Sequence, residues 1–467
     1  MISLCIGTFL LVKGEFVMKI HKQAIIDVSN LALPAVGENI LYMMIGVFDT
    51  MMVGQYGGNL AVSSVGLSSE IIYTFSNIFV GVGISVGITS LVARRIGAKD
   101  FKKAEEYATL GFVIASILAL LLGTVLVFFS KNILAFAGAD ENVVALGSPY
   151  MSIAGIGIFF NMLMNALNAT LRAFGNTRTP LLASGLVNIT NIFLDWVLIF
   201  GQLGFPELGV VGAALATAIA QFLGFVFISF YMYYKSEIKL NFSYLKNINK
   251  ESLNHLFRLS IPSSLQEASL NISRLLCNFM IISLGTIAFA SNQIATTIES
   301  ISFMPGWGFS VAATTLVGHK IGEKNFEKAK EYAKASILLG TGLMFICSFL
   351  FLFIPNVLIK LFINASEVEV IRLGTQCLMV AALEQPVMGL SMVVGGALKG
   401  VGDTKTPFIV SFISSWFIRL PLMLYFIYIK KSSVIFVWII TTIQWAFDGI
   451  VISYLFNKTV HKKFREK

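Results

Sequence analysis

Two aspartates and a nearby amide are the side chains of this sequence whose types and spacing could bind a cation. Asp49 lies inside the apolar stretch "GVFDTMMVG" (residues 46–54), and Asp195 lies inside "VNITNIFLDWVLIF" (residues 187–200). Asn191 and Asp195 are four residues apart, so a helix would place both on one face. Carboxylate and amide oxygens suit hard cations, while two adjacent acids can instead hold a proton between them. The sequence therefore predicts a site for Na⁺ or H⁺.

A hydroxyl group completes this candidate site. Thr217 stands in the small-residue run "GAALATAIAQ" (residues 212–221) and adds one more oxygen. We expect Asp49, Asn191, Asp195 and Thr217 to bind the cation, with Na⁺ held by the first three, and we expect no other cofactor. The alternative interpretation is that each aspartate is a hydrogen-bonded structural residue of the core.

The amino-acid composition indicates the environment of the elements that must position these side chains. The chain has 467 residues, of which 56% are hydrophobic and 13% are charged, and its mean hydropathy is +0.80. A soluble domain carries about 25% charged residues, so this surplus of apolar surface predicts an integral membrane protein. In a bilayer an isolated acid costs about 2.5–3.5 kcal/mol or more, and buried acids therefore face a cavity or a partner.

Twelve apolar runs are long enough to cross a bilayer, which takes about 20 residues. They cover residues 28–54, 60–91, 107–130, 146–172, 180–201, 209–234, 257–284, 288–316, 333–356, 370–398, 407–429 and 433–456. Their length and their lack of strict alternation favour helices over barrel strands. The predicted fold class is an all-α membrane protein with twelve transmembrane helices.

The basic residues gather in alternate connections between these runs. Residues 94–103, 235–250 and 319–330 are rich in Lys, Arg and His, as are the segments before the first run and after the last, whereas the opposite connections carry few. The positive-inside rule then places both termini in the cytoplasm. The net charge of +9 is thus a topology signal and calls for no nucleic-acid partner. We expect the inner (plasma) membrane of the cell as the location.

An internal repeat divides the chain into two halves. "LVARRIGAKDFKKAEEYA" (91–108) recurs as "LVGHKIGEKNFEKAKEYA" (316–333), and "LRAFGNTRTP" (171–180) recurs as "LKGVGDTKTP" (398–407). Because the repeat contains six runs, the halves share one orientation, as in transporters built from parallel repeats. We predict an N-terminal lobe over 18–234, a cytoplasmic linker over 235–256, a C-terminal lobe over 257–456 and a basic tail over 457–467. Residues 1–17 are predicted to be either a start-site extension or a weakly held interfacial segment.

These motifs resemble the multidrug and toxic compound extrusion (MATE) family. The first run "LALPAVGENILYMMIGVFDTMMVG" and the twin loops ending in TxTP carry the resemblance, which extends over residues 18–467 and is strongest to the prokaryotic DinF-like branch. It implies two six-helix lobes related by a pseudo-two-fold axis. It also implies antiport of Na⁺ or H⁺ against organic, often cationic amphipathic compounds. Residues matching Asp49, Asn191, Asp195 and Thr217 bind the cation in that branch.

The repeat offers an internal control for the two aspartates. The position equivalent to Asp49 in the second half is Cys277, and that equivalent to Asp195 is Leu422. A purely architectural acid would tend to occur in both halves. The asymmetry therefore favours a functional role for the pair.

Further candidates lie elsewhere in the chain. Glu267 and Glu384 form an alternative coupling site in the second half, where other branches of the family keep essential acids; a structural network of Glu267 with Arg274 is the competing interpretation. Pro34 lacks an N–H group and is expected to kink the first run, either as a moving hinge or as a static bend. Large apolar residues that could line a substrate cavity are Met43, Phe159, Met162, Met280, Phe303 and Trp307.

The twin loops and their neighbours predict helix ends. In the twin loops, we expect Gly175 and Gly402 to form the turns, and Thr179 and Thr406 to cap the helices that follow. Asp100 and Asn325 are expected to cap amphipathic helices.

Three competing functions remain at this point. A flippase for a lipid-linked saccharide would share the two-lobe architecture but would favour a strongly cationic cavity, and the sequence places no Lys deep within a run. An intramembrane enzyme lacks support because all four histidines fall at run ends or in loops. A channel shares the symmetry but cannot move a substrate uphill. The sequence favours a monomeric exporter of small molecules that is embedded in the lipid bilayer.

Overall fold

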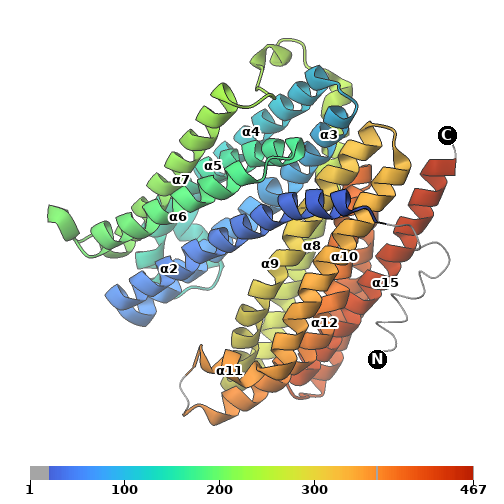
Figure 1. Cartoon of the computed structure of the whole chain (residues 1–467). Coiled ribbons are helices and arrows are strands. Elements are labelled where there is room, and N and C mark those ends of the chain that lie inside the picture. The colour runs from blue at the N-terminus through green and yellow to red at the C-terminus, as the bar shows by residue number, and fades with distance from the viewer. Residues whose placement is uncertain (1–19, 364–365, 466–467) are drawn as a thin grey trace. The chain divides into compact units, whose positions relative to one another are not determined.

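The computed structural model describes residues 20–363 and 366–465, and every regular element in these ranges is helical (Figure 1). The predicted start-site extension, residues 1–17, lies outside the described residues. The chain divides into two compact units, one formed by residues 37–264 and the other by the segment up to residue 36 together with residues 265–467. These limits differ from the predicted lobe boundaries of 18–234 and 257–456, which stay predictions.

The unit of residues 37–264, here called the aspartate unit, contains Asp49 and Asp195. Its elements are α2 (Lys22–Ser76) from Gly37 onward, the π-helical η1 (Asn77–Ile84), α3 (Ser85–Gly97), α4 (Phe101–Phe136), α5 (Glu141–Phe174), α6 (Arg178–Ile199), the short η2 (Gln202–Gly204), α7 (Gly209–Tyr234), η3 (Phe242–Leu245) and the first part of α8 (Lys250–Ile282). Helix α5 packs against α3, α4 and α7, and α7 also packs against α6. This packing surrounds the middle of α5 with protein.

The second unit, here called the glutamate unit, contains Glu267 and Glu384. It comprises the start of α2, the rest of α8, α9 (Thr286–Gly322), α10 (Phe326–Phe353), α11 (Pro355–Lys360), α12 (Val368–Val401), α13 (Lys405–Ile413), η4 (Ser414–Arg419), α14 (Leu420–Met423), η5 (Leu424–Ile429) and α15 (Ile435–Arg465). Its central helix is α12, which packs against α9, α10 and α15. Helices α5 and α12 are equivalent in the sequence repeat, so each unit is built around the same repeated helix.

The repeat is visible in the contacts inside each unit. In the aspartate unit, Thr89 Oγ1 donates a hydrogen bond to the carbonyl oxygen of Ala169 over 3.2 Å. In the glutamate unit, Thr314 Oγ1 donates to the carbonyl oxygen of Gly396 over 2.9 Å. These pairs occupy matching places in the repeat, so one hydroxyl ties α3 to α5 and its counterpart ties α9 to α12.

All twelve predicted runs fall on helices to within two or three residues. Among the described residues, nine helical segments are long and apolar enough to span a membrane, and one of them, Lys22–Gly97, holds the first two predicted runs. Helices α8 and α9, which are rich in hydroxyl and amide side chains, are not in that set. Gly58 separates the first two runs, because its φ of 59° and ψ of −149° interrupt α2.

The predicted helix ends are confirmed in part. Asp100 and Asn325 cap α4 and α10 by accepting hydrogen bonds from the backbone N–H groups of Lys103 and Lys328. Gly175 and Gly402 terminate α5 and α12 with φ of 94° and 87°, the left-handed region that glycine adopts without strain.

The prediction for the caps of α6 and α13 is wrong. Asn176 Oδ1 accepts from the N–H group of Thr179, and Asp403 Oδ1 accepts from that of Thr406. The Asx side chains precede the helices and reach the free N–H groups, whereas the threonines already lie within the first turn. The capping residue is therefore the Asx residue in each loop.

The helix surfaces suit a lipid solvent. Phe128, Phe136, Ile189 and Phe353 are each more than 70% exposed, an arrangement that would be unfavourable in water because apolar area stays solvated. In a bilayer these side chains meet acyl chains. The protein is thus a multi-pass membrane protein.

Candidate functional site

Three helices of the aspartate unit bring the predicted cation ligands together. Asp49 comes from α2, Asn191 and Asp195 from adjacent turns of α6, and Thr217 from α7. The hydroxyl group of Thr217 donates to Asp49 Oδ2 over 3.1 Å and accepts from Asn191 Nδ2 over 3.2 Å. The carboxyl group of Asp195 is close enough to that of Asp49 for the two groups to interact. All four side chains are at most 6% exposed.

The site keeps several oxygens without a protein partner. Asp49 Oδ1, Asn191 Oδ1 and both carboxyl oxygens of Asp195 are buried and accept no hydrogen bond. Buried polar atoms normally have partners, because leaving them unpaired costs free energy. These oxygens therefore suit a small cation, or a proton shared between the two acids. Within the described ranges no group of three or more His, Cys, Asp or Glu gathers for a metal ion.

Asn188 holds α6 against α2 near this site. Its side-chain amide donates to the carbonyl oxygens of Leu41 and Ser184, each over 2.9 Å. Because Leu41 is two helical turns before Asp49, this contact fixes the register of α2 along α6. The register in turn decides whether Asp49 can meet Asp195.

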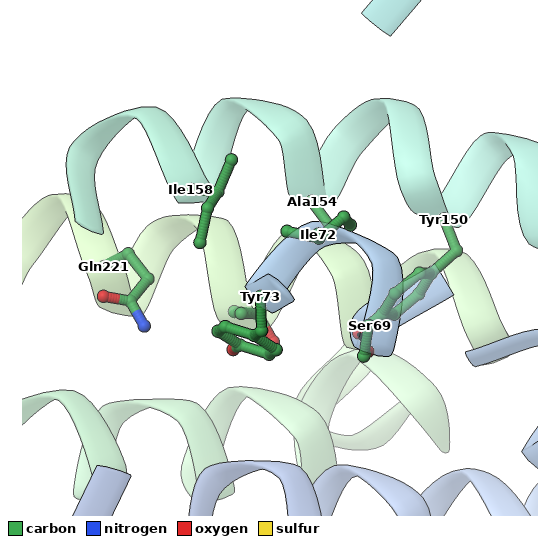
Figure 2. A pocket seen from close by; sticks show the side chains of 8 residues that line it. Ser69, Ile72, Tyr73, Tyr150, Ala154, Ile158 and Gln221 are labelled. Carbon is green, nitrogen blue, oxygen red and sulfur yellow. Dashed lines mark hydrogen bonds between the residues drawn. The ribbon is translucent and has the colours of Figure 1, made fainter. Parts of the chain in front are cut away.

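A small enclosed cavity adjoins the site (Figure 2). It measures about 10 Å³ and is lined by Ser69, Ile72, Tyr73, Tyr150, Ala154, Ile158, Thr217 and Gln221. Tyr150 OH and Ser69 Oγ are 3.0 Å apart. In Figure 2 Gln221 lies on the other side of Tyr73 from these two residues. Tyr73 and Tyr150 are also close enough to interact electrostatically with Asp49.

The sequence interpretation did not include these cavity residues. Tyr73, Tyr150 and Gln221 each stand in an apolar run, as Asp49 does. A polar side chain within an apolar run was the sequence signal that could have identified them. Spacing along one helix, however, does not reveal which residues of other helices lie beside it.

Comparison with known proteins identifies the family. A family model described as MatE matches residues 34–197 and 262–424, one match in each half of the repeat. The chain belongs to the MatE family. Both matches begin near a helix proline of the repeat, Pro34 in α2 and Pro262 in α8.

Named relatives agree with this assignment over nearly the whole chain. The chain is 30% identical over 450 residues to "Probable multidrug resistance protein NorM" of Thermotoga maritima, covering 96% of this chain and 93% of the relative. It is 29% identical to a protein of the same description from Agrobacterium fabrum, covering 84% of each. This MatE protein therefore has relatives described as multidrug resistance proteins over most of its length.

A solved structure shows the same fold. The structure described as the outward-facing conformation of a multidrug resistance MATE family transporter of the MOP superfamily superimposes with a TM-score of 0.87 at 22% identity, covering 95% of this chain and 99% of that one. The predicted all-α transporter fold is confirmed.

Pro34 lies inside an uninterrupted helical stretch of this MatE protein. Helix α2 continues through Pro34, and its non-helical residue is Gly58 instead. The missing N–H group of a proline removes one hydrogen bond of the helix ladder, so Pro34 weakens α2 locally without ending it. A role of Pro34 in conformational change stays a prediction.

The two acids predicted to form a second site have different partners. Glu267 on α8 accepts from Asn271 Nδ2 over 3.1 Å and interacts electrostatically with Lys399 at the end of α12. Glu384 lies fifteen residues before Lys399 on the same helix, a separation of about 22 Å at 1.5 Å per residue. Glu267 and Glu384 therefore do not contact each other in the glutamate unit, and a coupling role for these two acids stays a prediction.

The partner of Glu384 is another acid. Glu384 is fully buried and lies next to Glu299 of α9, with Arg419 of η4 and Trp445 of α15 nearby. Glu267 meets Arg274 indirectly, since Asn271 also accepts from Arg274 Nη2 over 2.9 Å. The sequence missed the contact of Glu299 with Glu384 because the two residues come from different helices.

The predicted substrate-cavity residues are divided between the two units, and their role stays a prediction. Met162 is fully buried in the core of the aspartate unit, where Phe159 packs against the same cluster. Met280 packs against a core cluster of the glutamate unit. Met43, Phe303 and Trp307 are half-buried. None of these six residues lines the cavity beside Thr217 or a second cavity beside Arg372.

Proposed function

We propose that this protein is a secondary active exporter that couples the exit of organic, often cationic amphipathic compounds to the entry of Na⁺ or H⁺. The coupling site is the cluster of Asp49, Asn191, Asp195 and Thr217. The protein works as a monomer of the plasma membrane, with both termini in the cytoplasm and no cofactor besides the coupling ion. Alternating access exposes the site to each side of the membrane in turn.

The observation that supports this proposal is the pair of buried carboxyl groups with unpartnered oxygens in a membrane transporter. Such a pair changes its net charge when a cation binds, so its surroundings favour different conformations in the two states. One charge moved down a potential of 100 mV releases about 2.3 kcal/mol, which can drive substrate efflux without ATP.

The test is efflux of a fluorescent organic cation, ethidium, from proteoliposomes under separately imposed sodium and pH gradients. We expect Asp49→Asn and Asp195→Asn each to abolish uphill efflux under both gradients, because either change removes a charge from the site. Asp100→Asn is the matched control: it makes the same chemical change at a helix cap, where Asn caps as well as Asp, and it should pump normally. Normal pumping by both site variants would contradict the proposal.

A further inference from the structure

A stripe of polar side chains runs along the middle helix of the aspartate unit. Asn161, Asn165, Asn168 and Arg172 follow one another on α5 at spacings that place them on one face of a helix. Asn165 Nδ2 donates to Asn161 Oδ1 over 2.9 Å. Asn161 and Asn168 are at most 1% exposed. We call these four residues the α5 stripe.

The first end of the α5 stripe reaches the cavity beside the carboxyl pair. Asn161 Nδ2 donates to Gln221 Oε1 over 3.0 Å, and Gln221 lines the cavity together with Thr217, the residue that donates to Asp49. A cavity of about 10 Å³ is at the lower limit of what can hold one water molecule, which needs two to four polar partners. Thr217, Gln221, Ser69 and the two tyrosines supply such partners. Polar groups therefore connect Asp49 to the α5 stripe.

An ion pair lies at the second end of the α5 stripe. Arg172 Nη1 donates to Glu38 Oε1 over 2.9 Å, and Asn168 Nδ2 donates to the same oxygen over 3.3 Å. Glu38 Oε2 and Asn168 Oδ1 are buried and have no hydrogen-bond partner. Arg172 lies in the last turn of α5, at the end that the charge distribution assigns to the cytoplasm.

The second half of the repeat lacks this stripe. Counting back from Lys399, which matches Arg172, the positions equivalent to Asn168, Asn165 and Asn161 are Gly395, Met392 and Met388. Amides inside a membrane helix are often interhelical contacts of modest strength, and such a role would not leave Asn168 Oδ1 unpartnered. The stripe thus accompanies the aspartate pair, in the same half of the molecule.

We propose that the coupling ion moves between the carboxyl pair and the cytoplasm along a hydrated path formed by the cavity and the α5 stripe. The amides hold water molecules that carry a proton or solvate Na⁺, and the Glu38–Arg172 pair closes the cytoplasmic end. This proposal rests on the proposed function, since it gives the site its route for ion release.

Thiol labelling tests the path without relying on transport. In a variant whose native cysteines are replaced by serine, Gln221→Cys and Asn165→Cys are treated with the water-soluble reagent methanethiosulfonate ethylammonium from the cytoplasmic side. We expect them to react at least about tenfold faster than the controls, because ionised thiols in contact with water are the reactive form. The controls are Ile228→Cys, a buried apolar position on α7, and Met392→Cys, the counterpart of Asn165. Equal rates for path and control positions would overturn the proposal.

Ion flux supplies the second test. Asn161→Met and Asn165→Met introduce the residue type that the chain uses at the matching positions of its other half, and Met388→Leu is the control in that half. We expect substrate-driven ion movement to slow by about tenfold in the two Asn variants, equivalent to about 1.4 kcal/mol of barrier, with ethidium binding at equilibrium unchanged. The control should behave as wild type.

The outcomes separate this proposal from the proposed function. If Asp49→Asn abolishes coupling while both stripe variants move ions at the wild-type rate, the path is wrong and the coupling site stands. If Asp49→Asn and Asp195→Asn retain coupling, the coupling site itself is wrong. Slow ion flux together with labelling at Gln221→Cys supports the path.

Discussion

At the scale of single residues, the proposed coupling site depends on one hydroxyl group between three helices. Thr217 donates to Asp49 and accepts from Asn191, so it orients both side chains and leaves their other oxygens available. A hydrogen bond to a charged group contributes about 1.5–3 kcal/mol. The loss of this one contact should therefore be measurable in ion affinity.

We predict that Thr217→Val raises the half-saturating concentration of the driving cation about tenfold to a hundredfold, since each 1.4 kcal/mol is a factor of ten. Valine has nearly the same shape but cannot donate to Asp49. Thr217→Ser keeps the hydroxyl group and should stay near the wild-type value. Efflux rates measured over a series of cation concentrations decide between them; equal values for the Val and Ser variants would show that the hydroxyl group is not used.

At the scale of helices, the close approach of repeated partners holds each unit together. A Cβ atom added to Gly396 of α12 would lie 2.3 Å from the carbonyl oxygen of Ser310 on α9, closer than atoms can pack. The same stretch of α9 carries Thr314, whose hydroxyl group bonds the carbonyl group of Gly396. Glycine at this position therefore permits both the packing and the hydrogen bond.

We predict that Gly396→Ala destabilises the protein by roughly 1–3 kcal/mol, the usual cost of overpacking. Gly342→Ala on α10 is the control, because nothing lies within 4 Å of its added Cβ atom; there alanine should be neutral or raise helix stability by up to about 1 kcal/mol. Thermal unfolding in detergent micelles, followed by circular dichroism, measures both changes. A melting temperature of Gly396→Ala at or above that of Gly342→Ala would contradict this account of the contact.

At the scale of the whole molecule, the distribution of charge predicts the orientation of the protein in the membrane. The basic segments 94–103 and 235–250 belong to alternate connections, whereas Lys360 lies in a connection of the opposite set. Cytoplasmic connections carry the excess of Lys and Arg. We therefore predict that both termini, the linker and the Arg172 end of the α5 stripe lie on the same side.

We predict that Lys246→Cys is protected from a membrane-impermeant maleimide applied to intact cells, and that Lys360→Cys is labelled, in the variant without native cysteines. Both side chains belong to connections between long helices, and they differ in the predicted side. Permeabilised cells should give labelling at both positions. The reverse pattern in intact cells would invert the assigned topology.

The sequence by itself determined the class of the protein, its repeat and the residues worth examining. Apolar length and scarce charge require a bilayer whatever the packing, and the faces shared by Asn191 and Asp195, or by the amides of α5, follow from helical spacing. Local sequence did not identify the caps in the twin loops correctly. There Asn176 and Asp403, and not the threonines, accept hydrogen bonds from the free N–H groups.

Only the tertiary structure decided which faces meet. Spacing along one helix says nothing about the register or rotation of its neighbours, which depend on how side chains of several helices fill space together. For that reason the sequence could not show that Thr217 bridges Asp49 and Asn191, that Gln221 joins the cavity to the α5 stripe, or that Glu384 lies beside Glu299 while Glu267 does not.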